Sequence, residues 1–213
     1  MQITEIFHSV QGESTRSGWP CVFVRTTGCN LRCTWCDTAY SFHGGEEMSV
    51  EEIVEEVERI GAGCRLVEIT GGEPLLQHDV GELAGALLER GYEVLCETSG
   101  SVPVDRVPEE VVVIMDLKAP GSGEVEANDW SNLERLDPGK DELKFVLADR
   151  EDYEWAVRQL RERELGRFTV HFSPVHAELD RRALAEWILE DGLDVRLNLQ
   201  IHKFVWDPET KGV

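Results

Sequence analysis

Short apolar runs and longer segments with helical periodicity take turns along this chain. The apolar runs alternate or are continuously hydrophobic, as strands in a half-buried or fully buried sheet are. The longer segments repeat their apolar residues every three or four positions, which predicts amphipathic helices. The predicted strands span residues 2–7, 21–25, 66–69, 93–96, 111–115, 143–147, 168–172 and 195–201, and the predicted helices begin at Ser49 or span residues 79–90, 151–163 and 181–190.

The helix that begins at Ser49 has the clearest local signals. Ser49 and Glu52 have the spacing of a capping box, in which each side chain binds a free backbone N–H of the first turn. Gly61 and Gly63 then end the helix, because glycine disfavours the helical backbone. Its apolar face is expected to consist of Ile53, Val54, Val57 and Ile60.

Strands that alternate with helices predict parallel pairing with right-handed crossovers. Helices are fewer than strands here, because residues 102–143 contain one strand and loops but no convincing helix. We therefore expect an α/β fold, an abbreviated open (β/α) barrel with a reduced helix layer. Residues 1–213 are expected to form a single domain, since the chain has no repeat and no linker.

The charge is strongly acidic. The chain has 42 Asp and Glu residues against 21 Lys and Arg residues, for a formal net charge of −21. Such a field repels nucleic acid and anionic membrane surfaces, so we expect no direct nucleic-acid or membrane partner. Excess carboxylate with little lysine fits a high-salt cytosol, and composition does not separate this from an ordinary acidic surface.

No apolar run approaches the length that spans a membrane, and the residues after Met1 do not resemble a signal peptide. We therefore expect a reducing, cytoplasmic location. Cys21, Cys64 and Cys96 lie in or beside apolar runs, which predicts small buried hydrophobic residues rather than disulfide partners.

Cys29, Cys33 and Cys36 have the spacing C-x3-C-x2-C on one short segment. Three soft thiolates so close together suit zinc or an iron–sulfur cluster. A structural zinc site needs a fourth Cys or His, and the nearest candidate, His43, stands alone. A four-iron cluster with three ligands leaves one iron open.

This cysteine spacing, with Trp35 just before the third cysteine, resembles the signature of the radical S-adenosylmethionine (SAM) superfamily. The resemblance implies that the three thiolates hold a [4Fe–4S] cluster and that SAM binds its open iron. In a (β/α) barrel, functional residues gather on the loops that follow the strands. The resemblance implies that SAM is contacted there by Gly72, Glu73, Glu97, Ser99, Asp116, Lys118 and Ser173, with Trp35, Cys36 and Asp37 from the cysteine segment.

A narrower resemblance covers essentially the whole chain. The segment from Glu5 to Glu13, Arg25 four residues before Cys29, and the C-terminal segment 199–206 are similar to the 7-carboxy-7-deazaguanine synthase family. The resemblance implies conversion of 6-carboxy-5,6,7,8-tetrahydropterin to 7-carboxy-7-deazaguanine for queuosine or archaeosine. A 5′-deoxyadenosyl radical would take hydrogen from the pterin, and ring contraction with loss of ammonia would follow, assisted by Mg²⁺.

The family's remaining roles can be assigned to matching positions. Thr38 would supply an oxygen to Mg²⁺, and no side chain is expected to act as the acid or base of catalysis. An electron donor such as flavodoxin or ferredoxin and a homodimeric state are also implied. Substrate contacts would come from Val10, Gln11, Gly12, Arg25 and Thr70.

Two alternatives remain open. A glycyl-radical activating enzyme belongs to the same superfamily, but it needs a protein partner and a groove for a peptide. A small metal-binding electron-transfer module would need a fourth ligand and would not need the loops after the strands.

Overall fold

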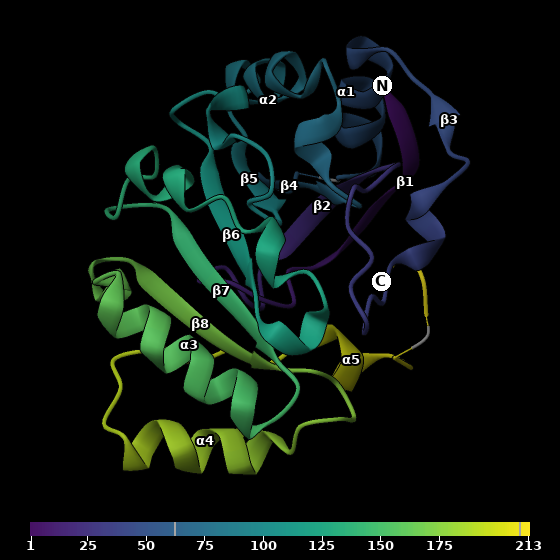
Figure 1. Ribbon diagram of the computed structural model, residues 1–213. Coiled ribbons are helices and arrows are strands. Elements are labelled where there is room, and N and C mark those ends of the chain that lie inside the picture. The colour runs from purple at the N-terminus through teal and green to yellow at the C-terminus, as the bar shows by residue number, and fades with distance from the viewer. Residues whose placement is uncertain (62, 209) are drawn as a thin grey trace.

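The computed structural model describes residues 1–61, 63–208 and 210–213. These residues form one curved sheet in the order β3-β1-β2-β4-β5-β6-β7-β8-β9, which does not close on itself (Figure 1). An open α/β barrel is therefore confirmed. The strands are β1 (Gln2–Val10), β2 (Pro20–Thr26), β3 (Glu46–Glu47), β4 (Leu66–Gly71), β5 (Glu93–Thr98), β6 (Val112–Lys118), β7 (Glu142–Leu147), β8 (Thr169–Pro174) and β9 (Arg196–Leu197).

Parallel pairing runs without interruption from β2 to β9, as the alternation of strands and helices predicts. The first strand is different, because β1 pairs with both β2 and β3 in the antiparallel sense. The connection at residues 11–19 contains no helix, and a short connection without a crossover can only reverse the chain. The N-terminal edge of the sheet is thus a hairpin that extends the barrel.

Four helices cover the outer face of the sheet and a fifth, short one lies beside the C-terminal end of the chain (Figure 1). The first four confirm the predicted helices to within a residue or two. The Ser49–Glu52 capping box is present in full. Residues 102–141 contain β6 and short 3₁₀ turns but no α-helix, so the reduced helix layer is also confirmed. The helices are α1 (Val50–Ile60), α2 (Val80–Glu89), α3 (Arg150–Glu162), α4 (Arg181–Glu190) and α5 (His202–Val205).

The predicted last strand, at residues 195–201, is wrong beyond Leu197. Asn198 still donates its backbone N–H to Phe172, but its side chain turns inward to the hydroxyl of Ser173 at 3.0 Å. The chain then crosses the end of the sheet, where the Ile201 N–H binds the Gly12 carbonyl at 3.0 Å. Polar anchors therefore replace strand pairing over residues 198–201, and α5 begins directly after the predicted strand.

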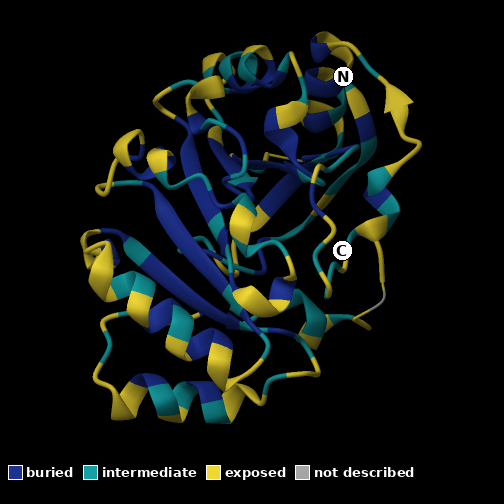
Figure 2. Cartoon of the chain, in the orientation of Figure 1, coloured by how far each residue is buried: buried dark blue, intermediate teal, exposed yellow. Residues whose placement is uncertain are grey.

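The central strands are largely buried, whereas the helices also carry exposed residues (Figure 2), and the two faces of the sheet bury different apolar clusters. The outer face and the helices enclose the main apolar core. Cys96 is fully buried in it, and Cys21 is fully buried in a smaller apolar cluster on the inner face, as predicted for both. Cys64 is only half-buried, which corrects that prediction, and its Sγ donates to the Pro20 carbonyl at the molecular surface. The smaller cluster consists of Cys21, Phe23, Leu66, Leu95, Val112 and Ile114.

Among the described residues, none of the helices combines the length and the apolar character needed to cross a lipid bilayer.

Candidate active site

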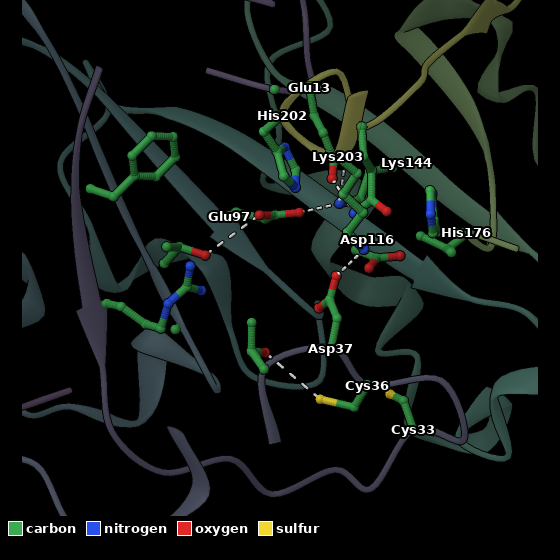
Figure 3. A pocket seen from close by; sticks show the side chains of 18 of the residues that line it. Glu13, Cys33, Cys36, Asp37, Glu97, Asp116, Lys144, His176, His202 and Lys203 are labelled. Atoms are coloured by element: carbon green, nitrogen blue, oxygen red, sulfur yellow. Dashed lines mark hydrogen bonds and ion pairs between the residues drawn. The ribbon is translucent and has the colours of Figure 1, made fainter. Parts of the chain in front are cut away.

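A cavity of about 640 Å³ opens on the inner side of the barrel, a size typical of small-molecule sites (Figure 3). Its walls come from the strand ends, the cysteine loop and the C-terminal segment. Most of the residues singled out in the sequence line this one cavity, although they come from six different segments. They are Val10, Gln11, Gly12, Arg25, Cys29, Cys33, Trp35, Cys36, Asp37, Thr38, Thr70, Gly72, Glu97, Ser99, Asp116 and Lys118.

The cysteine loop places Cys29, Cys33 and Cys36 at the mouth of the cavity (Figure 3 shows Cys33 and Cys36). The Cys36 N–H donates to the Cys33 carbonyl at 3.2 Å, which closes a tight turn between these two residues. Burial raises the pKa of the Cys29 and Cys33 thiols. Partial burial therefore favours the protonated thiols over free thiolates. A bound metal would stabilise the thiolate charge that burial disfavours, so the loop is suited to bind one.

The arrangement of these thiols fits a cluster better than a single ion. Among the described residues, no three Cys, His, Asp or Glu side chains converge closely enough to hold one metal ion. A tetrahedral zinc site needs four such ligands around one point. An iron–sulfur cluster instead spreads its thiolate ligands over several irons, and three half-buried cysteines around one cavity mouth suit it.

Two predicted SAM contacts, Glu73 and Ser173, do not line the cavity. The carboxylate of Glu73 is fully buried and accepts hydrogen bonds from the backbone and hydroxyl of Ser99, at 2.8 and 2.6 Å, and from the Thr98 hydroxyl. In this structure Glu73 fixes the turn after β5. Ser173 faces Asn198 and is likewise buried.

Asp116 and Lys118 form an ion pair of 2.8 Å on the cavity wall. Burial lowers the pKa of Lys118, but the charges of Asp116 and Cys33 outweigh it and the net pKa is raised. The second oxygen of Asp116, Oδ1, is buried with no hydrogen-bond partner among the described residues. An unpartnered buried acceptor on the wall of a cavity is suited to a ligand's hydroxyl or ammonium group, which fits SAM.

A lysine and several carboxylates form the floor of the cavity. Lys144 projects from β7 and its ammonium binds the carboxylates of Glu13, at 2.9 Å, and Glu97 (Figure 3). The amide of Gln200 also donates to Glu13 at 2.8 Å. Burial raises the pKa of Glu13, but Lys144 outweighs it and the net pKa is lowered, so this carboxylate stays ionised.

Sequence reasoning did not identify Lys144, Glu68 or His171 as cavity residues, although all three line it. Each is a charged or titratable residue inside an otherwise apolar strand run, and that interruption is the signal that could have found them. Strand periodicity assigns such a residue to the face opposite the apolar core.

The turn that follows β1 is closed by the C-terminal segment. The ring of His202 lies so close to Gly12 that a Cβ there would be 2.0 Å from its Nδ1, so only glycine fits. Lys203, the next residue, reaches the cysteine loop and pairs with Asp37 at 2.7 Å (Figure 3). Segments about 190 residues apart in sequence thereby form one wall of the cavity.

Arg25 emerges from β2 beside the cysteine loop, as predicted. Its Nε donates to Glu5 at 2.7 Å, and Tyr40 binds the same carboxylate oxygen, also at 2.7 Å. The guanidinium lies 5.6 Å from the centre of the Phe7 ring. Among the described residues, its two terminal nitrogens have no hydrogen-bond partner, so the outer edge of the guanidinium group is available to a ligand.

Comparisons with known proteins agree with this geometry. Residues 23–120 match the Radical SAM superfamily. Two similar relatives are 7-carboxy-7-deazaguanine synthases: one from Koribacter versatilis is 51% identical and covers 100% of each chain, and one from Chlorobaculum tepidum is 46% identical and covers 100% of this chain and 97% of its own. The fold is similar to a crystal structure of QueE from Escherichia coli, with a TM-score of 0.74, 24% identity and coverage of 93% and 92%.

Proposed function

Because this chain belongs to the radical SAM superfamily and, within it, to the 7-carboxy-7-deazaguanine synthase family, we propose that it converts 6-carboxy-5,6,7,8-tetrahydropterin to 7-carboxy-7-deazaguanine with loss of ammonia. The observation that carries the proposal is the single cavity that joins three cysteines at its mouth to Arg25 and a polar floor. Neither alternative, a glycyl-radical activating enzyme or an electron-transfer module, accounts for full-length relatives that share one enzymatic name.

Cys29, Cys33 and Cys36 would hold the cluster, and the wall formed by Asp116 and Lys118 would hold SAM. When bound, the [4Fe–4S] cluster and SAM supply the radical that removes a hydrogen atom from the substrate. The protein's own part is to place the substrate, keep water out and compensate charge.

Arg25 would hold the substrate's carboxylate. The free edge of its guanidinium can donate two parallel hydrogen bonds, and Glu5 and Phe7 fix the direction in which that edge points. Gln11, directly after β1, and Thr70 of β4 line the same cavity and would bind the pterin ring. Thr38 would supply one oxygen to Mg²⁺, which takes few protein ligands and keeps waters or substrate oxygens.

The remaining parts of the proposal rest on the family. An electron donor such as flavodoxin or ferredoxin would reduce the cluster, and the protein would act in the cytoplasm as a homodimer. Neither nucleic acid nor membrane would be a direct partner, since the net charge of −21 repels both.

Anaerobic reconstitution tests the function directly. The reconstituted protein should contain about four irons per chain, the content of one [4Fe–4S] cluster. With SAM, a reductant, Mg²⁺ and the carboxylated tetrahydropterin it should form the deazapurine and 5′-deoxyadenosine. Cluster formation without a deazapurine product would overturn the proposed substrate and leave the superfamily assignment intact.

A further inference from the structure

Glu68 is a buried carboxylic acid at the boundary between the polar floor of the cavity and the apolar cluster beneath it. The register of the sheet places it on the inner face of β4, opposite Phe23 of β2 and Leu95 of β5. Its exposed fraction is 3%, yet it lines the cavity. Both strand neighbours are apolar, so its surroundings solvate a charge poorly.

Among the described residues no cation forms an ion pair with Glu68, although the charge of the nearby Lys144 opposes the rise of its pKa. The Lys144 ammonium is shared by Glu13 and Glu97, and Lys118 pairs with Asp116. In the part of the chain that the structure describes, no Lys, Arg or His side chain binds Glu68, and its one partner is the neutral amide of Gln11. A buried carboxylate without a counter-ion is far less stable than the neutral acid.

The electrostatics agree with this geometry. Burial, and then repulsion from the nearby Glu97 carboxylate, raise the pKa of Glu68 well above its ordinary value. Gln11 occupies Oε2 of Glu68. The other oxygen, Oε1, has no partner among the described residues, so a neutral carboxyl group has a free O–H or C=O to offer to a ligand.

The walls beside Glu68 suit a flat ring. Phe7 stacks on Phe23 with ring centres 4.9 Å apart and planes 11° apart, and both rings line the cavity. Glu68 therefore lies at the edge of an aromatic surface. In the neutral carboxyl group Oε1 can donate as O–H, and Oε2 can accept a second hydrogen bond beside that from Gln11, which complements an adjacent C=O and N–H on the rim of a heterocycle.

We propose that Glu68 determines substrate specificity by binding an N–H/C=O edge of the substrate's pyrimidinone ring through a neutral carboxyl group. The proposal rests on the proposed function, since a pterin carries such an edge. It assigns to Glu68 a role separate from that of Arg25, which would hold the carboxylate at the other end of the substrate.

The test measures binding without turnover. The cluster-loaded enzyme, with SAM and no reductant, is titrated with the carboxylated tetrahydropterin. Glu68→Gln keeps one donor and one acceptor, so its Kd should stay within about threefold of wild type. Glu68→Leu has similar size but no hydrogen-bonding group, and its Kd should rise about tenfold or more because the ligand's edge loses its partners. The Kd of SAM should not change, and Glu109→Leu, at an exposed position, serves as the matched control.

Two binding results overturn the proposal. If both Glu68 variants bind the pterin as wild type does, Glu68 does not contact the substrate. If Glu68→Gln binds as weakly as Glu68→Leu, an ionised carboxylate is needed instead of a neutral one. If wild-type enzyme binds and converts the pterin but the Glu68 variants give either of these two results, the proposed function stays intact and only the role of Glu68 is overturned. Wild-type enzyme that neither binds nor converts the pterin overturns both.

An infrared measurement keeps the proposal testable if Glu68→Leu fails to fold. Wild-type enzyme should show the carbonyl band of a protonated carboxylic acid, and this band should shift when the pterin binds. Glu68→Gln should lack it. A spectrum in which wild type and Glu68→Gln do not differ in this region overturns the neutral carboxyl group.

Discussion

At the scale of single residues, the six cysteines divide by their position in the sheet. Three line the cavity mouth, two are fully buried in apolar clusters, and Cys64 is half-buried at the surface. This division follows from strand periodicity and from the loop between β2 and η1 (Ala39–Phe42), in which the cysteines have no strand partners. Substitution of the three cysteines at the cavity mouth should therefore abolish cluster binding, whereas substitution of the other three should leave iron content unchanged.

We predict that Cys29→Ala, Cys33→Ala and Cys36→Ala each lose the cluster and SAM cleavage, because a four-iron cluster with one open iron needs all three thiolates as ligands. Cys21→Ala, Cys64→Ala and Cys96→Ala are the controls and should keep normal iron content. Iron analysis after anaerobic reconstitution measures both groups. Loss of iron in Cys64→Ala with retention in Cys29→Ala would disprove the ligand assignment.

Arg25→Lys should leave the cluster intact and weaken use of the substrate. Lysine keeps the charge but loses the planar fork and its bond to Glu5. The loss in kcat/KM should be on the order of 2–5 kcal/mol if the ion pair with substrate is desolvated. More 5′-deoxyadenosine should form per deazapurine, because the reacting carbon is held less well.

Steady-state kinetics with that product ratio measures the effect. Arg59→Lys is the matched control, because Arg59 is exposed on α1 and, among the described residues, pairs only with Glu56. Unchanged KM and unchanged coupling in Arg25→Lys would place Arg25 outside the substrate site.

Thr38→Ala should weaken the dependence of turnover on Mg²⁺, because the ion would lose its protein oxygen. Thr38→Ser keeps that oxygen and should restore the wild-type titration. The Thr38 hydroxyl lies 3.7 Å from Cys36 Sγ, so iron content must be checked in both variants. Identical Mg²⁺ titrations for wild type and Thr38→Ala would remove Thr38 from the metal site.

At the scale of elements, the inner face of the barrel uses the two-residue period of a strand to separate two kinds of residue. Along β7, Glu142 and Lys144 face inward, whereas Leu143 and Phe145 pack outward into the main core. The inward charges are stable because they bind one another across strands, as Lys144 does with Glu97 of β5. A one-residue change of register would exchange these two sets.

The first residue of each helix is determined in part by local capping signals in the sequence. Ser49→Ala should destabilise the protein by about 1 kcal/mol, because the first turn of α1 loses its capping hydrogen bond. Ser49→Asp keeps a side-chain acceptor and should recover most of that loss. Urea unfolding of the three proteins measures it, and equal midpoints for wild type and Ser49→Ala would show that packing alone fixes the start of α1.

At the scale of the whole molecule, the acidic charge and the cavity are distinct features. The net charge of −21 comes mostly from exposed carboxylates on the helices and turns, whereas the cavity pairs most of its carboxylates with buried lysines. Surface repulsion of this kind destabilises the compact state and is reduced by salt.

Raising KCl from about 0.1 M to 1 M should therefore raise Tm at about pH 8, because the Debye length falls to a few ångströms. The gain should shrink at about pH 5.5, where the net charge approaches zero near the pI of about 4.6. Thermal unfolding at the two pH values measures this. A Tm that is independent of salt at the higher pH would contradict net repulsion as a factor in stability.

The sequence by itself determined the parts that depend on local periodicity and fixed spacing. The four long helices, the open barrel, the capping box at Ser49 and the three-cysteine loop all follow from patterns within about 15 residues, where backbone geometry decides which residues share a face. The family resemblance also rests on short spacings of this kind, and the comparisons confirm it.

Only the tertiary structure decided which polar residues meet. Residues 198–201, which were predicted to be part of a strand, instead cross the end of the sheet, and this places His202 on Gly12 and Lys203 on Asp37. The burial of Glu73 beneath the turn after β5 and the unpaired state of Glu68 beside Glu97 have the same origin. These features depend on contacts between distant segments, and the free energy of a buried charge is set by its neighbours in space, which the order of residues along the chain does not specify.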